Sequence, residues 1–519
     1  MSAENSKPLL ASEGIRAAAS RQPDKCAIRA YDQGEVVDQV SYAQLVARMN
    51  RVSDAARAQW GLKAGDRVAL AASNSIDFIA LTCGLGGVGI TVAKPNPKLS
   101  IREILAICSD AGASVLVCDA SIARAVREQA SASMQICAIG EELDELLAAA
   151  SDAHPKDSDL ADENSVFVMP YTSGTTGEPK GVCVTHRSRS LTFFGMGVEY
   201  GCYGPDDRFL GLAPLCHGAG FAFNIAPLYF GGSLDLYAKF DPAQILAHIG
   251  RGEVTGIFLV PTHFQGFFAL DEDALAKSHG HKLKAIISNA APLTQPIKER
   301  IVEHFGEGLL HECYGSTEAG IVTSMRPADQ LRKVQCVGRP FVNTSIRIVG
   351  DDGQEVIQGE VGELFSRSPY LFAGYRDRPD ETDRAMSDGW VSAGDLARQD
   401  EEGFYYIVGR KKEMIISGGI NIYPREVEFI LDQHPAIAES AVVGIPDDYW
   451  GEKIVAAITL KRGVMEPDEG VLTDWCTDRI GKQKIPKQFA VVEAFPRNAM
   501  GKVLKAEIAQ TLAPCTRVA

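Results

Sequence analysis

The residues from Tyr171 to Gly181 have the composition of a phosphate-binding loop. The segment reads Tyr-Thr-Ser-Gly-Thr-Thr-Gly-Glu-Pro-Lys-Gly and follows the apolar run 166–169, so it begins where a buried strand is expected to end. Its glycines let backbone N–H groups approach an oxyanion, its hydroxyls add donors, and its lysine adds a positive charge. The spacing differs from that of a Walker loop. A solvated turn is the alternative. The predicted phosphate contacts are Thr172, Ser173, Gly174, Thr175, Thr176, Gly177 and Lys180.

This loop closely resembles the signature loop of the adenylate-forming superfamily, which comprises acyl-CoA synthetases, adenylation domains of peptide synthetases, and beetle luciferases. The other superfamily motifs follow in the expected order between Tyr42 and Lys505. The resemblance implies that the chain uses ATP and Mg²⁺ to activate a carboxylic acid as acyl-AMP. It further implies transfer of the acyl group to the thiol of coenzyme A.

The segment Tyr314-Gly315-Ser-Thr-Glu resembles the nucleotide motif whose Thr contacts the α-phosphate and whose Glu helps to hold Mg²⁺. Thr317 and Glu318 inherit these roles, and Mg²⁺ does prefer carboxylate and phosphate oxygens. Without the resemblance, a Glu after Ser-Thr is more typical of a helix N-terminal cap.

The resemblance implies roles for three later motifs: one binds the ribose, one forms a hinge, and one lies beside the path of the thiol. Asp395, in Trp-Val-Ser-Ala-Gly-Asp, accepts hydrogen bonds from both ribose hydroxyls, as suits an acceptor-only carboxylate. Arg410 reaches ribose or phosphate, and Lys412 is the pivot of a domain rotation. Gly418 and Gly419 lie beside the thiol tunnel that the rotation opens. A charge cluster such as 410–413 is otherwise typical of a solvated turn.

Lys502 closes the segment Pro-Arg-Asn-Ala-Met-Gly-Lys, which resembles the motif carrying the lysine essential for adenylation. Ala499 stands where Thr or Ser is more common in the superfamily. The sequence around Lys502 is rich in basic residues. They provide local positive charge where polyphosphate must bind, although the chain as a whole is acidic. The basic residues are Arg479, Lys482, Lys484, Lys487, Arg497 and Lys505.

Two segments are implied to lie near the acid substrate. Pro-Leu-Cys-His217 resembles a segment of acyl- and aryl-CoA ligases and lacks the Asp with which amino-acid-activating members bind an ammonium group. His217 is implied to lie near the reacting carboxylate, and Phe221 and Phe223 are either pocket walls or ordinary core aromatics. The implied adenine segment consists of Asn289, Ala290, Ala291 and Pro292.

Asn289 stands where fatty-acyl and cinnamoyl ligases commonly have Gly. A side chain there shortens the acyl tunnel or adds a polar contact, so we expect an aryl or a short-to-medium acyl acid. Two alternatives share the first half-reaction: a ligase that loads a carrier-protein phosphopantetheine, and a luciferase-type oxygenase. The final Thr-Arg-Val-Ala lacks the Ser-Lys-Leu address of many luciferases and disfavours the latter.

Two other patterns do not carry function. Gly84–Gly89 satisfies G-x-G-x-x-G but ends an apolar helix-like run, whereas the dinucleotide fingerprint follows a strand and opens a helix. His279-Gly-His281 lacks companion metal ligands, and no G-x-S-x-G elbow occurs.

The elements that must position these residues follow an α/β pattern. Helical periodicity over 101–111 alternates with short β-branched runs, which predicts βα subdomains around parallel sheets, and Gly-rich turns after Val361 predict a small barrel-like or antiparallel part. The expected domains are a large N-terminal one over 1–409, a hinge at 410–412, and a small, mobile α+β domain over 413–519. The predicted strands are 115–118, 166–170, 256–260, 285–288, 362–366, 403–408, 438–443 and 454–460; a helix is predicted over 424–432 and a turn at 446–448.

Length and composition limit the classes available to this chain. Its 519 residues, 45% of them hydrophobic and 23% charged, are typical of a globular protein with more than one domain. A net charge of −15 argues against a broad nucleic-acid surface. The polar start and the absence of an ~18-residue apolar run predict a cytoplasmic protein without a membrane span. Twelve scattered cysteines without a C-x-x-C pair are expected to be core residues.

Overall fold

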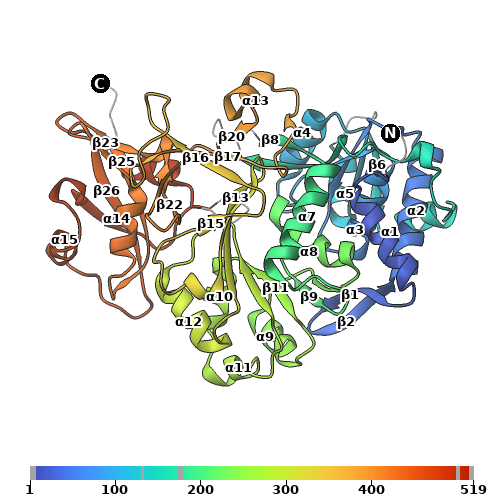
Figure 1. The fold of residues 1–519 in the computed structure, drawn as a ribbon, viewed down its shortest axis with the longest axis horizontal. Coiled ribbons are helices and arrows are strands. Elements are labelled where there is room, and N and C mark those ends of the chain that lie inside the picture. The colour runs from blue at the N-terminus through green and yellow to red at the C-terminus, as the bar shows by residue number, and fades with distance from the viewer. Residues whose placement is uncertain (1–6, 130–133, 174–178, 498–502, 514–519) are drawn as a thin grey trace. The chain divides into compact units, whose positions relative to one another are not determined.

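The computed structural model describes residues 7–129, 134–173, 179–497 and 503–513. The chain packs as two units, drawn in Figure 1. The first contains residues 1–346 and Ser366–Val391, and the second contains Arg347–Phe365 and the residues from Ser392 onward. The predicted hinge at 410–412 lies inside the second unit and stays a prediction.

A parallel sheet in the first unit carries the strands that precede most candidate site residues. Its order is β15-β14-β13-β12-β11-β9-β10-β1-β2. The strands from β13 to β1 are parallel, and β14, β15 and β2 add antiparallel edges. Their bounds are β1 Cys26–Asp32, β2 Glu35–Ser41, β9 Arg208–Gly211, β10 Ser233–Tyr237, β11 Gly256–Leu259, β12 Ala285–Ser288, β13 Leu310–Ser316, β14 Gly320–Met325 and β15 Arg339–Pro340.

A second sheet of this unit carries the phosphate-loop hairpin. Its order is β18-β8-β7-β4-β3-β5-β6, with β7 and the strands beyond it parallel and with β8 and β18 antiparallel. The central strands are buried runs of Val, Ala and Leu, as expected of a parallel sheet covered on both faces. The bounds are β3 Arg67–Ala71, β4 Thr91–Lys94, β5 Val115–Asp119, β6 Gln135–Ile139, β7 Val166–Ser173, β8 Pro179–Thr185 and β18 Gly374–Tyr375.

Four helices form a layer between these two sheets. Helices α3 (Ile76–Gly87) and α7 (His186–Tyr200) contact the second sheet, α8 (Gly218–Phe230) contacts β9 and β10, and α1 (Ala11–Arg21) touches all three helices (Figure 1). Helices α3 and α8 are apolar on nearly every side, as required of helices enclosed by protein. Any polar group in this layer must therefore find its partner inside the protein or in a ligand.

Helix α2 (Tyr42–Ala58) packs mainly against α1 and α3, and other helices of the unit cover the outer faces of the sheets. Residues of α9, α10 and α12 pack with β9 and β11 in one core, and residues of α4 and α5 pack with β3 and β5 in another. Helix α4 begins with a capping box between Ser100 and Glu103. The bounds are α2 Tyr42–Ala58, α4 Ile101–Ala111, α5 Ala120–Arg127, α6 Glu141–Ala148, α9 Pro242–Gly250, α10 Pro261–Phe268, α11 Glu272–Ala276, α12 Gln295–Phe305 and α13 Pro379–Ala385, beside the short strands β19 Met386–Ser387 and β20 Trp390–Val391.

The glycine-rich segment 84–89 has a packing role. It lies at the end of α3, where a Cβ atom on Gly84 would come within 2.5 Å of the Met49 carbonyl oxygen of α2. The glycines thus allow two helices to approach closely. They do not join a strand to a helix, so the expectation that this is not a dinucleotide fingerprint is confirmed.

The second unit is mainly antiparallel, as the sequence predicts for the region after Val361. Strands β17, β21 and β22 pair antiparallel, and β23 to β26 form hairpins to which β27 adds in parallel. The bounds are β16 Ser345–Val349, β17 Gly362–Arg367, β21 Asp395–Gln399, β22 Tyr405–Arg410, β23 Ile415–Ser417, β24 Ile420–Ile422, α14 Pro424–Leu431, β25 Ile437–Asp447, β26 Gly451–Leu460, α15 Glu469–Thr477, β27 Gln488–Val491 and α16 Lys505–Leu512.

The turn predicted at 446–448 lies at 448–450, two residues later. Strand β25 continues to Asp447, and Pro446 pairs with Glu452 of β26. Because β25 is at the edge of its sheet, a proline there removes no hydrogen bond that another strand needs.

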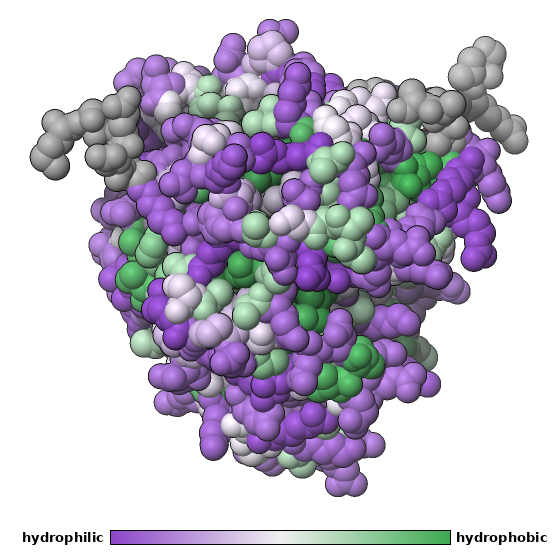
Figure 2. Space-filling view, turned by 90° about the vertical axis from the view of Figure 1, so that its right-hand side faces the viewer, coloured by the Kyte–Doolittle hydropathy of each residue, from purple (hydrophilic) through white to green (hydrophobic). Residues whose placement is uncertain are grey.

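The polarity of the surface and the burial of the cysteines are as the composition predicts. The face drawn in Figure 2 is mostly hydrophilic, with small, separate apolar areas. Within the described ranges every cysteine is free, and all but Cys26 and Cys183 are buried. None of the described helices is long and apolar enough to cross a membrane.

Candidate active site

Three predicted site segments follow the carboxyl ends of neighbouring parallel strands. Asn289 follows β12, Thr317 follows β13, and His217 lies six residues beyond Gly211, the end of β9. These strands belong to the run β13-β12-β11-β9, so their carboxyl ends share one edge of the sheet. Ligands of open α/β sheets bind at this edge.

Thr317 lies directly against residues 214–223, the segment predicted to contact the acid and here called the acyl segment. A Cβ atom on Gly218 would be 3.3 Å from the Thr317 hydroxyl oxygen, so Thr317 packs on the first residue of α8, next to His217. The predicted α-phosphate contact and the predicted acid-binding residue are therefore neighbours in the fold.

Glu318 occupies the turn between β13 and β14 and does not cap a helix, which excludes the alternative reading of this motif. The Tyr375 hydroxyl donates to its Oε1 atom at 2.8 Å, and its carbonyl accepts from the backbone N–H of Phe372. Burial, followed by the charge of Glu318, raises the pKa of Tyr375. Tyr375 pairs with Val182 of β8, so the acid is tied to the phosphate-loop hairpin.

The hairpin of β7 and β8 holds the ends of the phosphate loop. Thr172 pairs with Lys180 and Ser173 pairs with Pro179. The predicted contacts Gly174, Thr175, Thr176 and Gly177 lie outside the described residues.

Lys180 is already held by other side chains. Its ammonium forms an ion pair with Glu381 of α13 and lies 5.5 Å from the centre of the Tyr375 ring. The ion pair lowers the pKa of Glu381. The Lys180 ammonium, the Glu381 carboxylate and the Tyr375 ring thus lie together, and the Tyr375 hydroxyl joins this group to Glu318.

Gly315 is required by the strand pairing beside this turn. A Cβ atom there would come within 2.0 Å of the Gly320 carbonyl oxygen, a distance that only glycine permits. Tyr314 lies next to it in β13 and pairs with Thr323. The predicted nucleotide motif therefore lies at the tightly paired end of the hairpin formed by β13 and β14.

The predicted adenine segment is irregular and partly strained. The Asn289 amide donates to the Cys313 carbonyl at 2.6 Å and so joins the end of β12 to β13. Ala290 has φ +77°, a value that residues with side chains rarely adopt, whereas Ala291 and Pro292 are exposed.

Replacing Asn289 with Gly should shift the acid preference toward longer chains and leave the KM for ATP nearly unchanged. The change removes the side chain predicted to shorten the tunnel, together with its bond to Cys313. The measurement is kcat/KM for pyrophosphate release across a homologous series of acids. An unaltered chain-length profile would exclude this role.

The acyl segment is positioned by asparagines in the loops that follow β3 and β4 of the second sheet. The Asn74 amide donates to the carbonyls of Ala213 and Tyr237, and its oxygen accepts from the Leu215 N–H at 2.8 Å. The Asn96 amide lies 3.4 Å from Nε2 of His217. Burial, then the charges of Lys94 and Lys98, lowers the pKa of His217 to about 4, so the imidazole is neutral near pH 7.

The second unit contains the predicted ribose residues as a pair. Asp395 begins β21 and is buried, and Arg410 ends β22 directly opposite it. The guanidinium Nε lies 3.1 Å from the Asp395 carboxylate. Lys412 follows as an exposed residue of the 3-10 helix Lys411–Glu413.

Gly418 and Gly419 form the turn of the hairpin between β23 and β24. Both have positive φ, +59° and +78°, as a two-residue hairpin turn requires. The Gly418 N–H donates to the Trp450 carbonyl at 2.8 Å. Trp450 is 36% exposed, and the Lys487 ammonium lies 5.2 Å from the centre of its ring.

Lys502 lies outside the described residues. Several basic residues predicted to accompany it are engaged with acids: Arg497 pairs with Glu439, and Lys505 lies 2.7 Å from Glu428.

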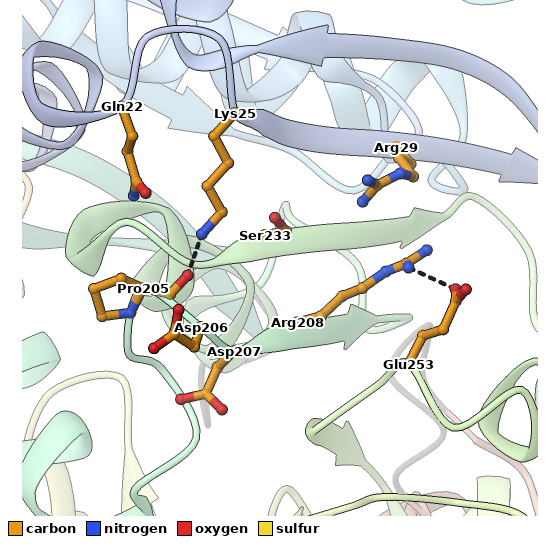
Figure 3. Close-up of a pocket in the computed structure, with 9 residues that line it drawn as sticks. All are labelled: Gln22, Lys25, Arg29, Pro205, Asp206, Asp207, Arg208, Ser233 and Glu253. Atoms are coloured by element: carbon orange, nitrogen blue, oxygen red, sulfur yellow. Dashed lines mark hydrogen bonds and ion pairs between the residues drawn. The ribbon is translucent and has the colours of Figure 1, made fainter.

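A surface pocket of about 370 Å³ lies elsewhere in the first unit (Figure 3). It is lined by Arg208 and Ser233, the first residues of β9 and β10. It therefore lies at the amino ends of the strands, away from the edge that holds the site. Its Arg208 is paired with Glu253.

Sequence reasoning missed the residues that hold the site residues in place. They are distant in sequence from the motifs and belong to no motif themselves, so their position in the fold is what identifies them. They are Asn74, Asn96, Tyr375, Glu381 and Trp450.

Comparison with known proteins shows the family of this chain. The model of the family described as AMP-binding enzyme matches residues 15–376, and that of the AMP-binding enzyme C-terminal domain matches residues 426–502. A feruloyl-CoA synthase from an Amycolatopsis species is 33% identical over 90% of this chain and 93% of its own. The crystal structure of ATP-bound MatB from Rhodopseudomonas palustris is similar with a TM-score of 0.87 and 28% identity, over 97% of this chain and 99% of MatB.

The o-succinylbenzoate CoA synthetase MenE from Bacillus subtilis, solved with its acyl-adenylate intermediate, gives a TM-score of 0.82 and 28% identity, over 95% of this chain and 97% of MenE. The fold, the order of the motifs and the matches over most of the length agree. This chain belongs to the AMP-binding enzyme family.

Proposed function

We propose that this protein is an AMP-forming acid–thiol ligase that converts an acid and ATP to acyl-AMP and pyrophosphate and then transfers the acyl group to coenzyme A. The observation that carries the proposal is the meeting of Thr317, His217 and Asn289 at one sheet edge. The feruloyl-CoA synthase and the MenE adenylate complex support the same reaction class.

The first step must overcome the repulsion between two negatively charged groups. The substrate carboxylate attacks the α-phosphorus, the bond from that phosphorus to the bridging oxygen breaks, and pyrophosphate leaves. Two anions must be brought together in line, so positioning and electrostatic stabilisation do most of the work. Thr317, the loop donors and Lys180 hold the phosphates in this proposal, and Lys502 faces the charge that develops during attack.

The described residues fit a Mg²⁺ ion that is held jointly with ATP. They contain no cluster of three or more His, Cys, Asp or Glu that could enclose a metal alone. Glu318 instead offers a carboxylate beside the phosphate-loop hairpin. Mg²⁺ in nucleotide sites is commonly held by one or two carboxylates and substrate phosphates. When bound, the ion neutralises phosphate charge.

In the second step the thiol of coenzyme A attacks the acyl carbon and AMP leaves. We place the ribose on Asp395 and Arg410, and the thiol path beside Gly418. An exposed indole with a lysine at its face suits the purine ring and phosphates of a nucleotide, so Trp450 and Lys487 are proposed contacts of coenzyme A.

Replacing Trp450 with Ala should raise the KM for coenzyme A about tenfold, because a stacked base contributes roughly 1–3 kcal/mol. Acyl-AMP formation without coenzyme A should be unchanged. Steady-state kinetics with varied coenzyme A measure the effect, and Trp450→Phe should restore most of the affinity. Equal losses in both half-reactions would contradict this role.

A panel of aryl and short-to-medium acyl acids, assayed for pyrophosphate release with and without coenzyme A, tests the proposed function. We expect acid-dependent pyrophosphate release and, with coenzyme A, a thioester and AMP. Release of phosphate in place of pyrophosphate, or no response to any acid, would refute the proposal.

A further inference from the structure

The imidazole of His217 has one side-chain hydrogen-bond partner among the described residues. Its Nε2 atom lies 3.4 Å from the Nδ2 atom of Asn96. His217 is the N-cap residue of α8, but its ring does not bond to the backbone N–H groups of that helix. Within the described structure, the second ring nitrogen, Nδ1, is therefore left for a ligand.

The orientation of the Asn96 amide follows from the backbone beside it. The Lys98 N–H donates to the Asn96 Oδ1 atom at 2.9 Å. A peptide N–H is a donor only, so the amide atom that faces Lys98 is the oxygen and the atom that faces His217 is the NH₂ nitrogen. An amide NH₂ can only donate, so Nε2 of the ring must accept.

This contact decides which ring nitrogen carries the proton. A neutral imidazole has one N–H and one nitrogen with a lone pair. Burial, followed by the charges of Lys94 and Lys98, lowers the pKa of His217 to about 4, so the ring is neutral near pH 7. Because Nε2 accepts from Asn96, the lone pair is on Nε2 and the proton is on Nδ1.

Other residues hold the backbone of the acyl segment beside the ring. Asn74 accepts from the Leu215 N–H at 2.8 Å, and the Lys94 ammonium donates to the Leu215 carbonyl at 3.2 Å. The Asn96 side chain is bonded to the His217 ring itself. At 3.4 Å this hydrogen bond is long, so we assign to it the orientation of the ring dipole and not a large binding energy.

We propose that Asn96 is a positioning residue that keeps the proton of His217 on Nδ1, so that Nδ1–H donates to the carboxylate oxygen of the acid that does not attack. This inference rests on the proposed function and adds the protonation state of the residue beside the acid. Thr317, the predicted α-phosphate contact, packs on Gly218, the next residue after His217. In the other tautomer, a nitrogen lone pair would face the carboxylate and repel it.

The tautomer can be read by NMR on protein labelled with ¹⁵N-histidine, without substrate and without turnover. Spectra near about pH 8 observe neutral imidazoles, because this is well above the ordinary pKa of histidine. The His217 signals are those that disappear in His217→Phe. We expect a proton on Nδ1 and the far-downfield shift of an unprotonated nitrogen on Nε2.

Asn96→Asp is the decisive variant. It keeps the size of the side chain and an oxygen for the Lys98 N–H, but it replaces the donor that faces His217 with an acceptor. The proton should therefore move to Nε2. In pyrophosphate release, the KM for the acid should rise at least ~10-fold, because a hydrogen bond to a charged group is replaced by a lone pair. The KM for ATP should stay within about twofold of the wild-type value, because the predicted ATP contacts are unchanged.

The added charge of the aspartate is separated from the tautomer by a double-mutant cycle. In the His217→Phe background there is no imidazole to reorient, so Asn96→Asp should have little further effect on the KM for the acid. An equal rise in both backgrounds would assign the effect to charge repulsion and contradict the proposal.

Asn74→Ala is the matched structural control. Asn74 bonds to the backbone of the acyl segment but does not contact the His217 ring. Its loss should leave the Nδ1–H signal in place even where it lowers the rate. If Asn96→Asp raises the KM for the acid while the proton stays on Nδ1, Asn96 acts only on the structure and the proposal is wrong.

The two readouts separate this inference from the proposed function. If the wild-type protein carries the proton on Nε2, the role of Asn96 is wrong and acid activation still stands. If the spectra are as expected but no acid releases pyrophosphate, the proposed function fails, and the role toward a carboxylate fails with it.

Discussion

Replacing Lys502 with Ala is expected to reduce acyl-AMP formation by ~10²–10³-fold or more, because it removes a cation that faces charge developing on the attacked α-phosphate. Thioester formation from synthetic acyl-AMP and coenzyme A should survive within about tenfold of the wild-type rate, since that step expels no pyrophosphate. Single-turnover assays of each half-reaction measure the two effects separately.

The matched variant is Lys412→Pro, which fixes the φ angle of the proposed pivot. It should spare adenylation and block thioester formation, the reverse of Lys502→Ala. Lys412 is an exposed residue of the 3-10 helix Lys411–Glu413 between β22 and β23, so the substitution restricts the backbone at the proposed pivot. If both variants damage both half-reactions equally, the proposal that one small domain serves two successive poses is wrong.

Replacing Glu318 with Gln should lower the rate of pyrophosphate release and raise the Mg²⁺ concentration needed for half-maximal rate by at least ~10-fold, because a neutral amide is a poorer Mg²⁺ ligand than a carboxylate. A Mg²⁺ titration at saturating ATP measures the shift.

Tyr375→Phe separates this role from a structural one. It removes the hydroxyl that donates to Glu318 but keeps the ring and the carboxylate. We expect its Mg²⁺ titration to shift much less than that of Glu318→Gln. Wild-type behaviour of Glu318→Gln across the titration would exclude Glu318 as a metal ligand.

The parts of the fold that depend on local sequence could be predicted. The helix predicted over 101–111 has those bounds because Ser100 and Glu103 cap its start and Gly112, with φ +62°, ends it. Strand β12 is the predicted apolar run Ala285–Ser288. The chain order of the motifs likewise indicated the family, since each motif is a short contiguous string.

What could not be predicted depends on contacts between distant segments. Lys180 and Glu381 are about two hundred residues apart, and the Glu318 interaction with Tyr375 needs the short pairing of β18 with β8. The positive φ of Ala290 carries no sequence signal. The helix-cap alternative for Glu318 failed because strand pairing with β14 outweighs a local capping preference.

The burial of Lys94 illustrates the same limit. In the sequence, Lys94 is an ordinary basic residue outside every motif. Only the fold brings it against the Leu215 carbonyl and the Phe221 ring and encloses it.

The central claim is that the acid is activated as acyl-AMP, and a heavy-oxygen label in the substrate carboxylate tests it most directly. When the carboxylate attacks the α-phosphorus and the thiol later attacks the acyl carbon, the oxygen that bridged acyl and phosphate leaves with AMP. Mass spectrometry of the products should find one labelled oxygen in AMP for each thioester formed and none in pyrophosphate. Label in inorganic phosphate, or AMP without label while the thioester accumulates, would contradict the account.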